Sequence, residues 1–389
     1  YGTRHLLTST LSETELQNVA WETATCLRES WAEVVYARWN EEDPTFEKGF
    51  PILPGVPLHQ TSGTTGVPKI AVRPGPCAVA EAEHYIQTAS ISGDDRILAV
   101  PPMSHAYAYG MCVMVPLLSQ ADVVCLSRFD VGQVFKVFEE ERITIFPAVP
   151  AMLDLMCLGS RELLQRSPKT VFCAGAPLSE RTARIYEERS GVVVKKLYGT
   201  TETGGISITM SEAEAKRTGC VGPPMEGVRS EVCVPTEASL GEGVGTLRIK
   251  SSSMMAGYLS QSGIDRSPVM EGWFETGDLA YQDEHGANHL QGRQTEVINV
   301  GGLKVVPSEV EAVLAQLPEV RELKVYAGTN RDGSQFVKVA IVPDGILDRK
   351  RLVEHCRQHL IYYKHPQKVI FVEQLPKTAS GKVILNELP

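Results

Sequence analysis

The chain has 389 residues, of which 43% are hydrophobic and 22% charged, so it can form a large buried core in one or two domains. Its net charge of -9 excludes the basic surface that binds nucleic acid or an anionic membrane. The sequence contains no signal-peptide pattern and no apolar run of about 18 residues, so we expect a cytoplasmic protein without a membrane span.

The N-terminal part of the chain is expected to be helical. Ser12 and Glu15 form a capping box at the start of an amphipathic segment that extends to Asn40. After a segment rich in glycine and proline, helical stretches alternate with short apolar strands. Helices are expected near 77–91, 107–118, 131–141 and 179–190, and strands near 97–100, 123–126, 143–146, 171–174 and 192–197. This alternation predicts a mostly parallel sheet with helices around it.

Two later regions differ from this pattern. Between about Met225 and Leu290 the helical periodicity ends, and short β-type runs separated by glycines predict a β-rich subdomain. Beyond Gly292 we expect a small α+β domain. Its helices begin at Pro307 and Asp348, and its strands lie near 323–326, 337–342 and 369–372. The predicted fold class is therefore α/β, with a large N-terminal domain and a small C-terminal domain.

The stretch TSGTTGVPK has the composition of a phosphate-binding loop. Its glycines let the backbone turn so that successive amide hydrogens face one anion, while hydroxyl groups and a lysine add donors and positive charge. The residues concerned are Thr61, Ser62, Gly63, Thr64, Thr65, Gly66 and Lys69. The alternative, a flexible surface linker, is disfavoured by the Pro-Lys end and by the apolar run before the loop. The spacing is not that of a Walker loop.

Two motifs follow expected strand ends, where parallel sheets bind ligands. In YGTTE, Tyr198 offers a ring that can stack on a purine, Thr201 a phosphate donor and Glu202 a magnesium ligand. In CAGAPL, residues 173–178, small side chains permit the close approach of a flat ring. Each motif alone has a structural alternative, an ordinary turn between two elements.

Two more motifs lie in the C-terminal third of the chain. GWFETGDLA presents Asp278, a carboxylate able to accept both hydroxyls of a ribose, and Arg293 adds a donor further on. PKTASGK places Lys382 in a short glycine-bearing loop close to the end of the sequence. Taken singly, Asp278 would be a turn residue and Lys382 a solvated lysine.

Seven stretches share their order and spacing with a known family: TSGTTGVPK, PPMSHAYAYG, CAGAPLS, LYGTTE, GWFETGDLA, GRQTEVINVGGLKVVPSEVE and LPKTASGK. Together they resemble the adenylate-forming superfamily of acyl-CoA and aryl-CoA synthetases, peptide-synthetase adenylation domains and luciferases. The resemblance implies an acid-thiol ligase that uses ATP and Mg²⁺ to convert a carboxylic acid to an acyl-adenylate, with release of pyrophosphate. The acyl group would then pass to the thiol of CoA or of a carrier protein's phosphopantetheine.

Matching positions imply a role for each of these residues. The loop at 61–69 would hold the β- and γ-phosphates, Thr201 the α-phosphate and Glu202 the magnesium ion. The residues around the adenine would be Ala174, Gly175, Ala176, Pro177 and Tyr198, and those around the ribose Asp278 and Arg293. Gly199 and Thr200 would also belong to the nucleotide site. Lys382 would bridge the substrate carboxylate and the α-phosphate, where a positive charge offsets their repulsion.

The resemblance also implies two domains that change their relative orientation. A large adenylation domain would cover residues 1–293, with a shortened segment ahead of the phosphate loop, and a small mobile domain would cover 294–389. Thr295 stands at the hinge position, where relatives usually carry Asp or Lys. Rotation would replace Lys382 at the site by Gly301 and Gly302, which would line the thiol channel.

The identity of the acid is inferred from pocket chemistry. The stretch 101–118 contains no acidic residue to pair with an ammonium group, which disfavours a free amino acid. The paired glycines at 204 and 205 are expected to leave room for a ring, and tyrosines can hydrogen-bond a hydroxyl. The expected pocket residues are His105, Tyr107, Tyr109, Gly110, Val149, Cys173, Gly204 and Gly205. We expect an aromatic, hydroxybenzoate-like acid, with a fatty acid as the alternative.

Two other classes of protein compete with this enzyme. A non-catalytic relative that binds a nucleotide or an acyl group is disfavoured by the complete set of charged site residues. A metal site at His355 and His359 lacks the glutamate of an HExxH arrangement, which favours ordinary histidines on a helix surface. The 9 cysteines form no CxxC pair and lie mostly in apolar runs, so we expect reduced thiols, without disulfides or zinc.

Overall fold

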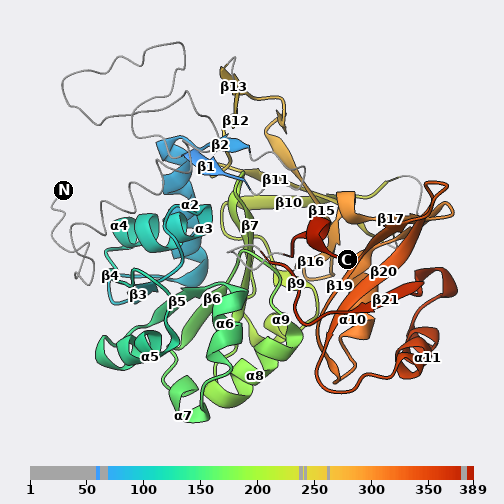
Figure 1. Cartoon of the computed structure of the whole chain (residues 1–389). Helices are drawn as coiled ribbons and strands as arrows, with labels where there is room; N and C mark the ends of the chain where they lie inside the picture. Colours follow the sequence, from blue (N-terminus) through green and yellow to red (C-terminus); the bar gives the residue numbers. More distant parts are fainter. Residues whose placement is uncertain (1–57, 62–68, 236–239, 241–242, 261–262, 378–382) are drawn as a thin grey trace. The chain divides into compact units, whose positions relative to one another are not determined.

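The computed structural model describes residues 58–61, 69–235, 240, 243–260, 263–377 and 383–389 (Figure 1). The chain divides into two compact units. The first unit is the chain up to Ser230 together with Ile249–Phe274, and the second is Glu231–Arg248 together with Glu275–Pro389. The helix expected at 12–40 lies outside the described residues, and the domain boundary after Arg293 stays a prediction.

The first unit is built around a six-stranded sheet with the order β4-β3-β5-β6-β7-β8 (Figure 1). The strands are β3 (Arg96–Ala99), β4 (Asp122–Cys125), β5 (Ile145–Ala148), β6 (Thr170–Cys173), β7 (Lys195–Thr200) and β8 (Gly204–Ile208). Neighbouring strands from β4 to β7 are parallel, and only the β7–β8 pair is antiparallel. β3 to β6 are short, mostly buried apolar runs, as expected of strands covered on both faces. The α/β class and the mostly parallel sheet are confirmed.

Helices accompany these strands as the alternating pattern predicts. They are α2 (Gly75–Ala89), α5 (Val131–Glu140), α6 (Pro150–Met156), α7 (Arg161–Leu164), α8 (Glu180–Ser190) and α9 (Glu212–Ala215). Asp130 caps α5 by accepting the Gln133 N–H, and the apolar face of α5 buries Val134, Phe135 and Phe138. These side chains belong to a large cluster that also contains Phe146 of β5. The amphipathic spacing thus directs each helix onto the sheet.

Two elements differ from the expectation. The helix expected at 107–118 is divided into α3 (Ala106–Tyr109), a π-helical turn η1 (Gly110–Met114) and α4 (Val115–Ser119). Pro116 cannot donate a backbone hydrogen bond, and the wider turn just before it accommodates that break. The strand expected at 192–197 instead runs from Lys195 to Thr200, because pairing with β8 extends it through Tyr198.

A second sheet of the first unit holds the ends of the predicted phosphate loop. Its strands are β1 (Leu58–Gln60), β2 (Ile70–Val72), β12 (Gly257–Ser260) and β13 (Gly263–Asp265), in the order β1-β2-β12-β13 and all antiparallel. Two further short strands of this unit are β9 (Cys220–Gly222) and β14 (Val269–Met270). The loop is therefore the connection of a hairpin formed by β1 and β2.

The second unit contains the later part of the chain (Figure 1). One sheet has the neighbouring strands β10 (Val228–Cys233), β11 (Gly245–Ser251), β15 (Trp273–Gln282) and β16 (Asn288–Arg293). A hairpin follows, β17 (Ile298–Val300) and β18 (Leu303–Val305), and then a sheet of β19 (Val320–Thr329), β20 (Gln335–Pro343) and β21 (Lys368–Phe371). Its helices are α10 (Pro307–Leu314) and α11 (Arg349–His359), with 3-10 turns η2 (Gln294–Glu296), η3 (Tyr362–Lys364) and η4 (Leu385–Glu387). The β-rich region and the helices expected from Pro307 and Asp348 are confirmed, with Asp348 as the cap of α11.

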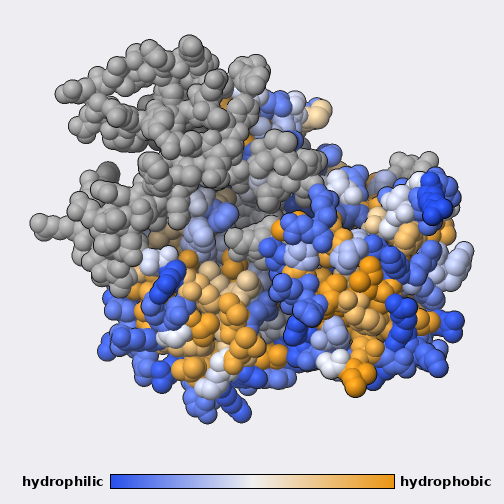
Figure 2. Space-filling view, viewed as in Figure 1, coloured by the Kyte–Doolittle hydropathy of each residue, from blue (hydrophilic) through white to orange (hydrophobic). Residues whose placement is uncertain are grey.

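Each unit has its own hydrophobic core. In the second unit, Leu314 of α10 and Leu352 of α11 pack with Val339 of β20. Figure 2 shows apolar side chains in patches among hydrophilic ones on both units, as is usual for protein surfaces. Within the part of the chain that the structure describes, no helix combines the length and apolar character needed to cross a membrane. The cysteines of this part are mostly buried, as expected of small hydrophobic side chains.

Candidate active site

The predicted site residues of the first unit gather at one edge of the parallel sheet. Val149 follows β5 directly, Cys173 ends β6, and Tyr198 lies near the end of β7. His105 follows β3 in the loop before α3. Because these strands are parallel, their carboxyl ends lie at the same edge, which is where α/β sheets bind ligands.

The ends of the phosphate loop are fixed by the hairpin. The Thr61 N–H donates to the Lys69 carbonyl at 2.8 Å, and the Lys69 N–H donates to the Thr61 hydroxyl at 3.2 Å. Thr61 is buried and Lys69 exposed. The residues between them, Ser62, Gly63, Thr64, Thr65 and Gly66 included, lie outside the described residues. Their phosphate role stays a prediction.

Lys69 and Glu202 are brought together by a tyrosine that the sequence analysis did not select. Tyr258 of β12 pairs with Ala71 of β2, two residues beyond Lys69. The Lys69 ammonium lies 4.8 Å from the centre of the Tyr258 ring, and the Tyr258 hydroxyl donates to Oε1 of Glu202 at 2.7 Å. A cation at the base of the loop and a half-buried carboxylate therefore contact the same side chain.

Glu202 lies in the tight turn between β7 and β8. Its carbonyl accepts the Met255 N–H at 2.7 Å, so the turn is also held from outside. Gly199 is required here, since a Cβ at this position would lie 2.4 Å from the Gly204 carbonyl oxygen. The Thr200 hydroxyl accepts the Thr203 N–H at 3.2 Å. Thr201, next to Glu202, is half-buried.

The CAGAPL motif forms the connection from β6 to α8. The Ala174 N–H donates to the Ala148 carbonyl at 3.2 Å and continues the sheet pairing by one residue. Gly175 then turns with a φ of 91°, in the region that glycine adopts without strain. Gly175 and Pro177 are exposed and Ala176 half-buried, so the loop offers small groups at the sheet edge. This placement agrees with a surface for a flat ring.

A buried ion pair lies beneath the turn that carries Glu202. Arg73, which follows β2, contacts Glu81 of α2 at 2.7 Å, and both residues are fully buried. Burying two charges costs several kcal/mol per ion unless each finds close partners. Glu81 also accepts the Tyr85 hydroxyl at 3.3 Å and the Gly205 N–H at 3.1 Å. The guanidinium donates to the Ser253 carbonyl through Nε and Nη2.

The predicted room for a ring beside Gly204 and Gly205 is occupied by these side chains. A Cβ at Gly204 would lie 2.7 Å from the Glu81 carboxylate, and one at Gly205 would lie 2.6 Å from the Tyr85 hydroxyl. At Gly110 the added carbon would lie 3.0 Å from the Glu81 carboxylate. The expectation that the paired glycines leave space for a ligand ring is therefore wrong on the side where a Cβ would lie, because protein side chains fill that space. Their small size instead accommodates the buried ion pair.

The remaining pocket candidates lie near a buried histidine. The His59 ring is 5.3 Å from the Tyr109 ring, and burial together with the nearby Arg73 charge lowers the pKa of His59 to about 4. A neutral imidazole therefore stands beside Tyr109 at pH 7. His105 is exposed, whereas burial raises the pKa of Tyr107 well above its usual value. Tyr107 thus lies in a dry environment and titrates only far above neutral pH.

Asp278 and Arg293 meet in the second unit. They are opposite each other in the β15–β16 pair, and the Arg293 Nε lies 2.6 Å from Oδ1 of Asp278. The Asp278 N–H donates to the Thr276 hydroxyl, which itself donates to the Leu247 carbonyl of β11. The structure thus brings the two residues together, while the ribose role of each stays a prediction.

The other predicted residues of the second unit lie at turns. Thr295 is in the η2 turn directly after Arg293. Gly301 and Gly302 form the turn of the β17–β18 hairpin with φ values of 59° and 92°, and both are exposed. Lys382 lies outside the described residues. The hinge, channel and catalytic assignments stay predictions.

The competing metal site has a simpler explanation. His355 donates a ring N–H to the Val313 carbonyl at 3.0 Å, and His359 donates one to the His355 carbonyl at 2.9 Å. Both rings are thus engaged with backbone of α10 and α11. Among the described residues no group of three or more His, Cys, Asp or Glu side chains could hold a metal ion.

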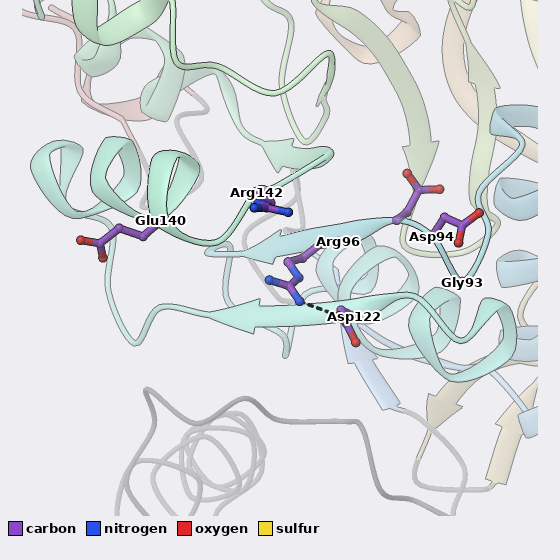
Figure 3. Close-up of a pocket in the computed structure, with 7 residues that line it drawn as sticks. Gly93, Asp94, Arg96, Asp122, Glu140 and Arg142 are labelled. Carbon is purple, nitrogen blue, oxygen red and sulfur yellow. Dashed lines mark hydrogen bonds and ion pairs between the residues drawn. The ribbon is translucent and has the colours of Figure 1, made fainter.

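A polar pocket lies at the opposite edge of the parallel sheet, with a volume of about 360 Å³ (Figure 3). It is lined by Gly93, Asp94, Asp95, Arg96, Asp122, Glu140 and Arg142. Arg96 and Asp122 are the first residues of β3 and β4, so this is the amino edge. Arg96 pairs there with Asp122 at 2.8 Å and with Glu141 at 3.3 Å. Arg96 and Asp122 thus form an ion pair between two lining residues of the pocket.

Sequence reasoning missed Tyr258, Arg73 and Glu81. Tyr258 is joined to the loop only through the β2–β12 pairing, whose partners are far apart in the chain. A signal for Arg73 existed, because an arginine directly after the apolar run IAV stands where a buried strand continues. An arginine there requires a buried carboxylate, and Glu81 on the next helix provides one.

Comparison with known proteins agrees with this geometry. Residues 58–259 match the family of AMP-binding enzymes, and residues 309–382 match the AMP-binding enzyme C-terminal domain. An indoleacetate–CoA ligase of Aromatoleum aromaticum is 30% identical over 88% of this chain and 67% of its own length. A long-chain-fatty-acid–CoA ligase of Mycobacterium tuberculosis is also 30% identical, over 85% of this chain and 66% of its own length.

A solved structure also has a fold similar to that of this chain. The ATP-bound crystal structure of MatB from Rhodopseudomonas palustris has a TM-score of 0.76 and 26% identity, covering 85% of this chain and 66% of that one. The chain thus spans about two thirds of the length of the relatives that it matches. The two matching domains, the identity to the ligases and the shared fold lead to one assignment. The chain belongs to the AMP-binding enzymes, the adenylate-forming superfamily.

Proposed function

We propose that this chain is an ATP-dependent acid-thiol ligase. It activates a carboxylic acid to an acyl-adenylate with release of pyrophosphate and then transfers the acyl group to a thiol. The observation that carries this proposal is the meeting of Lys69, Tyr258 and Glu202. A cation at the base of a glycine-rich loop and a carboxylate beside it are the groups needed for a triphosphate and its metal ion.

Magnesium fits the chemistry of Glu202. Mg²⁺ is usually held by one or two carboxylates together with substrate phosphates, and bound there it neutralises phosphate charge. The Tyr258 hydroxyl uses only one acceptor position of the carboxylate, which offers about four. The hydrogen bond orients Glu202 and leaves it able to bind a cation. Thr201, the neighbouring residue, is proposed as the donor to the α-phosphate.

We further propose residues for the nucleotide base and the ribose. Tyr198 and the loop from Ala174 to Pro177 lie at the carboxyl ends of neighbouring strands, so an adenine ring can contact both. Asp278 is oriented by the Arg293 guanidinium, which suits a carboxylate that accepts hydroxyl hydrogen bonds. We assign the ribose to this pair.

Lys382 is proposed to act on the reacting atoms. A carboxylate that attacks phosphorus approaches a group of the same charge, and an ammonium between them lowers that repulsion most at the transition state. We further propose that Thr295 is the hinge of a rotation and that Gly301 and Gly302 line the thiol channel afterwards. The η2 turn at Thr295, directly after Arg293, supports the first of these assignments.

For the acid we propose an aromatic substrate and for the thiol either CoA or a carrier protein. Support for the ring comes from His59 and Tyr109, whose side chains are in contact at the edge of the expected pocket. The relative named as an indoleacetate–CoA ligase also takes an aromatic acid. The relative named as a long-chain-fatty-acid–CoA ligase keeps the fatty acid as a second candidate.

The direct test is acid-dependent ATP–pyrophosphate exchange with a panel of carboxylic acids. Benzoates, hydroxybenzoates, arylacetates and fatty acids of increasing length would be compared, first without an acceptor and then with CoA or a holo carrier protein. Exchange that is fastest with aromatic acids is the expected result. Nucleotide binding without exchange for any acid would favour a non-catalytic relative.

The two half-reactions can be separated by two variants. Lys382→Ala should lower adenylation by about two to four orders of magnitude but spare thioester formation from supplied acyl-adenylate. Gly302→Leu should lower thioester formation and spare adenylation, because a side chain would narrow the channel. Gly333→Leu is the matched control, since Gly333 also has a positive φ, 83°, and open space at its Cβ. Equal losses in both half-reactions for Lys382→Ala and Gly302→Leu would contradict the alternation.

A further inference from the structure

We propose that Arg73 and Glu81 are positioning residues, which fix the turn between β7 and β8 so that Glu202 binds magnesium. This inference rests on the proposed function, because it assigns a purpose to Glu202. Neither residue touches the expected ligands, since both are fully buried. Their effect must therefore pass through the backbone that they hold.

Glu81 holds the far side of the turn. Its Oε1 accepts the Gly205 N–H at 3.1 Å, and Gly205 is the second residue of β8. Gly204 follows the turn with a φ of 74°. A Cβ at this position would lie 2.7 Å from the Glu81 carboxylate, so no side chain fits. The position of β8 immediately after Glu202 is thus set by one buried carboxylate.

Arg73 holds the same turn through a second segment. Its guanidinium donates to the Ser253 carbonyl at 3.1 and 3.3 Å, and the Ser253 hydroxyl donates to the Thr203 carbonyl at 2.7 Å. Two residues later, the Met255 N–H donates to the Glu202 carbonyl at 2.7 Å. Residue 253 is therefore hydrogen-bonded to Arg73, and residues 253 and 255 are both hydrogen-bonded to the turn.

The same two segments present Tyr258 and Lys69. Arg73 ends the run that begins at Lys69, and Tyr258 follows Met255 by three residues. The Ala256 N–H donates to the Val72 carbonyl at 2.8 Å, which keeps these two segments in register. The ion pair consequently ties the loop base, the Tyr258 strand and the Glu202 turn into one assembly.

Stability alone gives a weak reason for such a pair. Replacing a buried ion pair by apolar side chains of similar volume is often neutral or stabilising, whereas removal of one partner leaves an uncompensated charge. A pair with several directional hydrogen bonds fixes positions that apolar contacts would leave adjustable. This difference separates a positioning role from a purely structural one.

The experiment uses a double variant, Arg73→Met with Glu81→Leu, which removes both charges and keeps a filled core. Metal affinity is measured by electron paramagnetic resonance with Mn²⁺ and a non-hydrolysable ATP analogue, and the magnesium dependence of ATP–pyrophosphate exchange is measured in parallel. We expect the metal affinity to fall by about tenfold or more, in the range typical of residues that orient a metal ligand. Thioester formation from supplied acyl-adenylate should change less than about twofold, because that step releases AMP and uses no pyrophosphate-bound metal.

Two controls keep the result interpretable. Tyr186 lies on α8, away from the turn, and its hydroxyl donates to the Ser167 hydroxyl at 2.8 Å. Tyr186→Phe removes this hydroxyl and should leave the metal affinity unchanged. Arg73→Lys is the second variant should the double variant not fold, since it keeps a positive charge beside Glu81 but loses the guanidinium geometry that donates twice to the Ser253 carbonyl. Its expected loss of affinity is smaller than that of the double variant.

Failure of the positioning role and failure of the proposed function give different results. A folded double variant with the metal affinity of the unmodified chain would overturn the positioning role, and so would equal losses in adenylation and thioester formation at unchanged metal affinity. If the unmodified chain binds Mn²⁺ and nucleotide but exchanges pyrophosphate with no acid, the proposed function fails. The metal affinity of the variants then still decides whether Arg73 and Glu81 position Glu202.

Discussion

The two edges of the parallel sheet are both polar, yet their charges are arranged differently. At the amino edge, Arg96 pairs with Asp122 within the pocket (Figure 3) and with the neighbouring Glu141. At the carboxyl edge, the motifs at the ends of β6 and β7 lie side by side. The Glu202 carboxylate there accepts a hydrogen bond from Tyr258, and the Glu202 main-chain carbonyl accepts one from the Met255 N–H. The ion pair of the first edge is partly exposed, whereas the second edge presents a carboxylate that a hydrogen bond orients.

Charge density alone therefore does not identify a functional site. The amino-edge pocket is lined by more acidic residues, but its ion pair between Arg96 and Asp122 is partly exposed. Beneath the carboxyl edge lies the fully buried Arg73–Glu81 pair, whose bonds lead to the turn of Glu202. Oriented groups with buried support are the feature expected of a site for chemistry.

The largest expected effect at the carboxyl edge is that of Glu202→Gln. The amide keeps the size of the side chain but lacks the charge that a hard cation needs, so adenylation should fall by about two orders of magnitude or more. The measurement is acid-dependent ATP–pyrophosphate exchange across magnesium concentrations. Unchanged turnover at limiting magnesium would count against Glu202 as a ligand.

The next effect is that of Lys69→Ala on the use of ATP. Loss of a charged hydrogen bond to phosphate, about 1.5 to 3 kcal/mol, should raise the KM for ATP by roughly 10- to 100-fold. Lys195→Ala is the matched control, because Lys195 also lies over an aromatic ring, that of Phe172, but at the start of β7. Equal effects of the two substitutions would remove the distinction between the edges.

A smaller effect is expected for Tyr258→Phe. The ring beneath Lys69 remains, while Glu202 loses a hydrogen bond worth about 1 kcal/mol, so the apparent magnesium affinity should fall by roughly three- to tenfold. Titration of exchange activity with magnesium measures this shift. If the shift is absent while Glu202→Gln is inactive, Tyr258 does not orient the carboxylate.

The smallest effect is expected at the amino edge. Arg96→Met should leave exchange activity within about twofold and lower the free energy of unfolding by at most about 1 kcal/mol, since the pair with Asp122 is partly exposed. Urea denaturation and the same exchange assay provide both values. A loss of activity comparable to that of Lys69→Ala would place function at this edge.

Much of the fold was predictable because local patterns and tertiary packing agree. The alternation of helical and apolar stretches predicted β3 to β7 and the helices around them, and strand ends correctly located the YGTTE and CAGAPL motifs at one edge. These features depend on residues close together in the chain or on strand direction.

The missed features depend on contacts between distant segments. The partner of Tyr258 is fixed by the β2–β12 pairing, and the space beside Gly204 and Gly205 is filled from α2, more than a hundred positions earlier in the sequence. A paired glycine shows that something approaches closely, but it does not show whether a ligand or a side chain does so. The expectation of a ring there failed for this reason.

The most direct test of Glu202 as the metal ligand is the position of the bound metal ion. Crystals of the chain with Mn²⁺ and a non-hydrolysable ATP analogue would be measured for anomalous scattering at the manganese edge. We expect a peak in contact with the Glu202 carboxylate, close to the Tyr258 hydroxyl. A peak in the pocket between Asp94 and Asp122, with none at Glu202, would contradict this expectation.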